Sequence, residues 1–121
     1  MLNRFHWIEI GRVEDIPVQG ARTVRTPEGD VAVFRTAAGE VFALRDRCPH
    51  AGGPLSQGIV HGRSVTCPLH AWVIDLATGE ATGPDEGCTG SIPLRVEDGM
   101  IRLGMGSGRL KRAGGTGGCH D

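Results

Sequence analysis

Residues 48–50 are Cys-Pro-His and residues 67–70 are Cys-Pro-Leu-His, so a thiol and an imidazole stand close together on each of two short segments. The full pattern is Cys-x-His-x16-Cys-x2-His, and its candidate ligands are Cys48, His50, Cys67 and His70. Two sulfur and two nitrogen ligands suit a tetrahedral zinc ion, or a two-iron cluster with sulfurs on one iron and nitrogens on the other. The sequence therefore predicts a metal centre held by two loops.

The distribution of ligand types between the two segments favours the two-iron cluster. Zinc fingers usually place two cysteines on one segment and two histidines on another, whereas each segment here has one of each. A mixed segment can reach both irons of a dinuclear centre. Cys48 and Cys67 are then expected on one iron, and His50 and His70 on the other. From these residues alone, structural zinc or a site without metal stays open as the alternative.

The ligand pattern resembles that of Rieske [2Fe-2S] proteins, and residues 48–55, Cys-Pro-His-Ala-Gly-Gly-Pro-Leu, are similar to their first ligand loop. Within that family, residues 52–88 resemble the small subunit of assimilatory NAD(P)H-dependent nitrite reductase. This narrower resemblance rests on Trp72 and on Gly-Pro-Asp-Glu-Gly-Cys at residues 83–88. In all, the similarity covers about residues 5–103.

The resemblance implies a Rieske-type [2Fe-2S] cluster, with no catalytic residue in this chain. Its implied ligands are Cys48, His50, Cys67 and His70. Because protein groups fill all four ligand positions, neither iron can bind substrate, and the expected chemistry is outer-sphere transfer of one electron. The resemblance implies that nitrite is reduced to ammonia on a larger partner subunit with sirohaem, a [4Fe-4S] cluster and FAD. This chain is then expected to be the accessory redox subunit of that enzyme.

A Rieske ferredoxin that delivers electrons to a ring-hydroxylating dioxygenase is the alternative function. Its size and cytoplasmic character fit equally well, while Trp72 and residues 83–88 favour the nitrite reductase subunit. A chain of 121 residues is not expected to be a complete Rieske oxygenase, because it leaves no room for the mononuclear iron domain. A module in which zinc merely holds the loops is a third hypothesis, which iron and sulfide analysis distinguishes.

The loop residues also predict a low reduction potential. High-potential Rieske proteins of respiratory complexes have an extra cysteine in each ligand loop, joined as a disulfide, whereas the matching positions here are Gly53 and Leu69. The chain has no tyrosine, and Trp72 stands at a position where those proteins have serine. Fewer hydroxyl donors stabilise the added negative charge less, so we expect a midpoint in the lowest third of the roughly −150 to +300 mV range of Rieske centres.

Composition argues against several other functions. The net charge is −1, Lys111 is the only lysine, and 4% of the residues are aromatic, so no nucleic-acid partner is expected. The first residues contain no apolar run long enough for a signal peptide or a membrane span, and a cytoplasmic protein without membrane attachment is expected. In a reducing compartment, the remaining cysteines, Cys88 and Cys119, are expected to be free thiols.

Short apolar runs separated by turn residues predict an all-β fold, and no window has a sustained helical period. The expected strands span residues 5–10, 21–26, 31–35, 41–44, 59–60, 64–66, 72–76, 92–96 and 100–103. The Rieske resemblance implies an antiparallel β-sandwich with a small inserted cluster-binding subdomain. We expect residues 1–103 to form this domain, with the cluster-binding loops within about residues 46–80. The glycine-rich residues 104–121 are expected to be a disordered tail.

Overall fold

The computed structural model describes residues 6–27, 29–47, 53–68, 71–82, 87 and 89–105. In this part of the chain the strands form three antiparallel sheets, with the orders β1-β9-β8, β2-β3-β4 and β5-β6-β7. The elements are β1 His6–Arg12, η1 Val13–Asp15, β2 Gly20–Thr26, β3 Gly29–Arg35, β4 Val41–Arg45, η2 Leu55–Gln57, β5 Ile59–His61, β6 Ser64–Thr66, β7 Val73–Asp75, β8 Leu94–Glu97 and β9 Met100–Met105, where η1 and η2 are single turns of 3-10 helix. The predicted all-β sandwich is confirmed.

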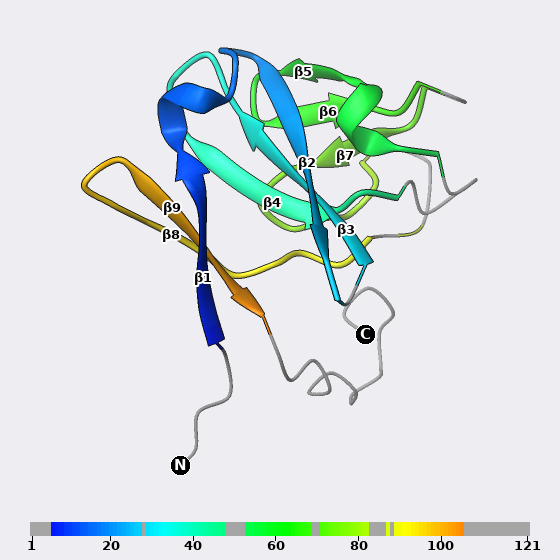
Figure 1. Cartoon of the computed structure of the whole chain (residues 1–121). Coiled ribbons are helices and arrows are strands. Elements are labelled where there is room, and N and C mark those ends of the chain that lie inside the picture. Colours follow the sequence, from blue (N-terminus) through cyan, green and yellow to red (C-terminus); the bar gives the residue numbers. More distant parts are fainter. Residues whose placement is uncertain are drawn as a thin grey trace.

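The sheet β2-β3-β4 is the middle layer and is covered on both faces (Figure 1). Successive side chains of a strand point to opposite faces, so a strand covered on both sides needs an uninterrupted apolar run. Residues 31–34 of β3, Val-Ala-Val-Phe, have no exposed surface. Val31 and Val33 pack in one core with Ile101 of β9, while Phe34 packs in a second core with residues of β5, β6 and β7. The domain therefore has two cores, one on each side of β3.

The sheet β5-β6-β7 is inserted between β4 and β8, as the expected subdomain required. β5 and β6 form a tight hairpin in which His61 pairs with Ser64, and Gly62 adopts a φ of 57° in the turn. Val65 pairs with Val60 on one side and Ile74 on the other. These three side chains are buried and face the middle sheet, so apolar packing fixes the inserted sheet against the rest of the fold.

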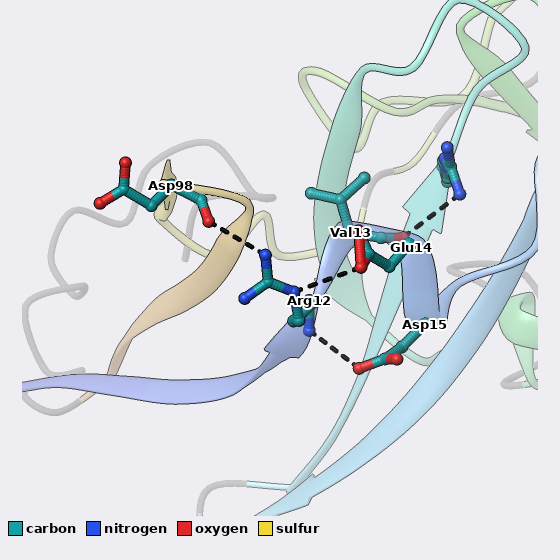
Figure 2. A network of polar contacts seen from close by, with 6 residues as sticks. Arg12, Val13, Glu14, Asp15 and Asp98 are labelled. Carbon is teal, nitrogen blue, oxygen red and sulfur yellow. Dashed lines mark hydrogen bonds and ion pairs between the residues drawn. The ribbon is translucent and has the colours of Figure 1, made fainter.

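The first and last strands of the described chain lie together, because β1 pairs with β9. Polar contacts around Arg12 tie the end of β1 to the turn between β8 and β9 (Figure 2). The Arg12 guanidinium donates to the Asp98 carbonyl oxygen at 3.3 Å, and the backbone N–H of Val13 donates to the Gly99 carbonyl oxygen at 2.9 Å. The Arg12 backbone N–H also donates to the Asp15 carboxylate at 2.9 Å. These contacts close the sheet β1-β9-β8 at one end.

Some strand boundaries differ from the sequence-based expectation, for reasons of hydrogen bonding. β8 begins at Leu94 rather than at Ile92, because Ile92 still donates its N–H to the Ala43 carbonyl oxygen of the middle sheet at 2.9 Å. β9 continues to Met105, where both Gly104 and Met105 are buried. Residues 106–121 of the expected tail lie outside the described residues. Within the described part of the chain, no helix is long and apolar enough to cross a membrane.

Candidate metal centre

The structure describes one of the four predicted ligands, Cys67, whereas Cys48, His50 and His70 lie outside the described residues. Cys67 directly follows β6 and is 1% exposed. Its thiol is not part of a disulfide, and it belongs to the core between the middle and inserted sheets. The predicted thiolate ligand is therefore placed at the end of a strand and shielded from solvent.

The second predicted ligand loop is closed at its base by two backbone hydrogen bonds. The N–H of Cys67 donates to the Trp72 carbonyl oxygen at 2.7 Å, and the N–H of Ala71 donates to the Cys67 carbonyl oxygen at 3.1 Å. Ala71 has a φ of 60°, in the left-handed region that residues with a Cβ seldom adopt. The chain thus reverses between β6 and β7 within a tight loop whose first residue is Cys67.

Trp72 has a packing role that the sequence left open. Its side chain is half-buried and lies against the core that contains Cys67 and Leu55. This packing removes part of the indole from water at the residue that follows the second predicted ligand loop.

The first predicted ligand loop begins after β4 and ends at η2, and Asp46 and Ser56 join its two ends. One carboxylate oxygen of Asp46 accepts the Ser56 backbone N–H at 2.7 Å, and the other accepts the Ser56 hydroxyl at 2.7 Å. Thr23 of β2 donates its hydroxyl to the same carboxylate at 3.1 Å. Sequence reasoning missed these residues, although an aspartate two positions before Cys48 and a serine soon after the loop were a visible signal.

The described residues fit a Rieske-type cluster. A buried cysteine without a disulfide supplies a soft ligand, and apolar side chains around it provide the low-water environment that tunes such a cluster. Leu55, at the end of the first loop, and Cys67, at the start of the second, belong to the same core. Both loops are therefore anchored at one end of the inserted sheet, as shared ligation of one cluster requires.

The remaining histidine and cysteine near the inserted sheet lie away from this arrangement or outside the described part. His61 is exposed, and its Nε2 lies 2.6 Å from the Thr66 hydroxyl oxygen. Cys88 and residues 83–86 lie outside the described residues. A groove of about 390 Å³ lies between β4 and residues 91–94, but no predicted ligand lines it.

Comparison with known proteins identifies the domain type. The family of the Rieske [2Fe-2S] domain matches residues 6–93, a span that contains all four predicted ligands. A 4beta-methylsterol monooxygenase of Methylococcus capsulatus is 45% identical over 60% of this chain, but the match spans only 19% of that protein. The 3-phenylpropionate/cinnamic acid dioxygenase ferredoxin subunit of Photorhabdus laumondii is 40% identical, over 75% of this chain and 87% of the subunit. The anthranilate 1,2-dioxygenase ferredoxin subunit of Burkholderia cepacia is 31% identical, over 83% of this chain and 93% of the subunit.

Solved structures similar to this fold include a protein assigned as a nitrite reductase small subunit and a ferredoxin. A Mycobacterium tuberculosis protein assigned as an NADH-dependent nitrite reductase small subunit has a TM-score of 0.78 and 23% identity, covering 87% of this chain and 99% of that one. A ferredoxin of Sphingomonas yanoikuyae has a TM-score of 0.74 and 25% identity, covering 84% of this chain and 100% of that one. At 23% identity, the first likeness establishes the fold alone.

Proposed function

Because this chain belongs to the Rieske [2Fe-2S] family and binds that family's cluster, we propose that it is a ferredoxin delivering electrons to the oxygenase of a ring-hydroxylating dioxygenase system. One observation supports this most directly: ferredoxin subunits of such systems align over most of both chains, at up to 40% identity. The sequence resemblance had favoured the nitrite reductase small subunit. The related sequences favour the ferredoxin alternative instead.

We further propose that Cys48 and Cys67 provide the thiolate ligands and that His50 and His70 provide the imidazoles. The spacing of the four residues and the match of the Rieske family across residues 6–93 support this set. The burial of Cys67 at the base of a closed loop supports it independently.

The described residues hold the ends of both predicted ligand loops. When bound, a Rieske cluster supplies transfer of one electron without a bond to substrate. The hydrogen bonds between Cys67, Ala71 and Trp72 restrain the second loop, and the Asp46–Ser56 pair restrains the first. Cys67 is buried and Trp72 is half-buried. NAD(P)H yields two electrons at once, so a one-electron carrier has to be loaded twice for each NAD(P)H oxidised.

Reconstitution with purified components tests the proposed function. The chain replaces the native ferredoxin in a 3-phenylpropionate dioxygenase system containing its reductase, its oxygenase, NADH and substrate. We expect substrate-dependent product formation that disappears when this chain is omitted. A matched control is Cys67→Ser, which removes one proposed ligand with little change in side-chain size. The proposal would be refuted if the chain, with its cluster intact, supported no ring-hydroxylating oxygenase.

A nitrite reductase small subunit is the second candidate, favoured by Trp72 and by residues 83–88. In that case a large subunit with sirohaem, a [4Fe-4S] cluster and FAD is the partner, and catalysis takes place there. Nitrite-dependent oxidation of NAD(P)H that requires both this chain and such a subunit would support this candidate. The two assays use the same preparation, so their outcomes can be compared directly.

A further inference from the structure

We propose that Asp46 is a positioning residue for the first ligand loop, acting as a clamp that holds the two ends of the loop together. The proposal rests on the proposed ligand set, because Cys48 and His50 lie between Asp46 and its partner Ser56. The clamp is defined as Asp46, Ser56 and Thr23. Neither the ligand pattern nor the electron-transfer function by itself assigns these three residues a role.

The carboxylate of Asp46 is well placed to fix the loop. It accepts both the backbone N–H and the hydroxyl of Ser56, each at 2.7 Å, across a separation of 10 residues. Hydrogen bonds to an ionised acceptor are shorter and stronger than those between neutral groups. Two bonds from one residue, one to each carboxylate oxygen, fix both the distance and the orientation of the loop ends.

The clamp is also bonded to two strands of the middle sheet, β2 and β3. The backbone N–H of Asp46 donates to the Asp30 carbonyl oxygen of β3 at 3.0 Å. The Thr23 hydroxyl of β2 lies 3.1 Å from the Asp46 carboxylate and 3.0 Å from the Ser56 hydroxyl oxygen. Asp46 and Ser56 are both half-buried, so water competes less for these bonds than it does at an open surface. The loop ends are therefore fixed relative to strands that pack in the core.

The physical consequence concerns retention of the metal. A loop whose ends are already fixed loses less conformational entropy when its ligands bind the cluster than a loop whose ends are free. Removing the clamp should speed release of the cluster without removing any proposed ligand. The chain offers a matched control in Asp75, whose carboxylate accepts the N–H groups of Ala77 and Thr78 at 2.8 and 3.2 Å in a turn after β7.

The test compares Asp46→Ala, Asp46→Asn, Ser56→Ala and Asp75→Ala in the intact, cluster-loaded chain. The readouts are the rate of iron release to a chelator, the EPR spectrum of the reduced protein and the reduction midpoint. For Asp46→Ala we expect release at least about tenfold faster than in wild type, equivalent to about 1.4 kcal/mol, together with a changed EPR spectrum. Asp75→Ala should stay within about threefold of wild type, because it loses comparable turn contacts outside the first loop.

Asp46→Asn separates geometry from charge. The asparagine oxygen can still accept the Ser56 N–H, and its NH₂ group can donate to the Ser56 hydroxyl oxygen, so slow release should be restored. The midpoint should nevertheless rise, because a negative charge near the cluster is lost. If Asp46→Ala does not fold, Ser56→Ala decides the question: it removes one of the two bonds, and release should be about fivefold faster.

Three results would overturn the clamp: release from Asp46→Ala no faster than from Asp75→Ala, release from Asp46→Asn as fast as from Asp46→Ala, or wild-type release from Ser56→Ala. Failure of the proposed function would be a different result: the wild-type chain would retain an intact cluster, but no oxygenase would accept its electrons.

Discussion

Replacing Gly79 with alanine is expected to destabilise the domain far more than the same change at Gly39. Both glycines lie in turns and have positive φ, 80° at Gly79 and 91° at Gly39. Their surroundings differ. A Cβ at Gly39 would meet no atom within 4 Å, whereas a Cβ at Gly79 would come closer than 3.0 Å to the Thr89 carbonyl oxygen. The pair therefore separates backbone strain from steric exclusion.

The magnitude follows from the two contributions. A residue with a Cβ at positive φ costs about 1 kcal/mol, and this cost applies to both variants. Gly79 is buried, and its carbonyl oxygen accepts the Thr89 N–H at 2.7 Å, so the neighbouring backbone cannot move away without breaking that bond. Such overpacking adds about 1–3 kcal/mol. We expect losses of about 1 kcal/mol for Gly39→Ala and about 2–4 kcal/mol for Gly79→Ala.

Thermal melting followed by far-UV circular dichroism measures the difference. For a domain of this size, 1 kcal/mol corresponds to a shift in Tm of about 4 °C, so the two variants should melt about 4 °C and about 8–16 °C below wild type. Because a bound cofactor can break two-state behaviour, the variants are compared at equal cluster content and scan rate. Equal reductions in Tm for both variants would refute the reasoning, since only Gly79 is expected to clash.

Four further outcomes are expected. A redox titration should give a midpoint in the lowest third of the range of about −150 to +300 mV, and a clearly positive value would contradict the argument from missing hydroxyl donors. His70→Cys should lower the midpoint if the cluster survives, because a thiolate adds negative charge at the iron; an unchanged midpoint would count against His70 as a ligand. Phe34→Ala should cost about 3–5 kcal/mol, because Phe34 has no exposed surface. Ile59→Ala, at a side chain 69% exposed, should change stability by less than about 0.5 kcal/mol in the same melting assay.

Local sequence predicted the strands well because most of them are short apolar runs between turn residues. The strands expected at residues 59–60 and 64–66 are present as β5 and β6, which pair with each other. Ile92 was misassigned to β8, because its apolar side chain suits a strand while its N–H is bonded to the middle sheet instead. Such a hydrogen bond depends on a segment almost 50 residues away, which no local pattern contains.

The candidate site was predictable to a different degree. The ligand pattern lies within residues 48–70 and is set by chemistry that local sequence displays directly. The clamp between Asp46 and Ser56 was not predicted, because its residues are ordinary polar types whose meaning depends on the loop closing. The role of Trp72 was likewise undecided until its packing against the core was visible.

By itself, the sequence predicted an all-β chain and two mixed cysteine and histidine segments suited to one two-iron cluster, because ligand type, ligand spacing and strand periodicity are local properties. Only the tertiary structure decided that β1 pairs with β9, that β3 is covered on both faces, and that Cys67 is buried in the same core as Leu55 at the end of the first loop. The physical reason is that pairing and burial depend on surfaces from distant segments meeting, and the apolar area removed from water is defined only when they do.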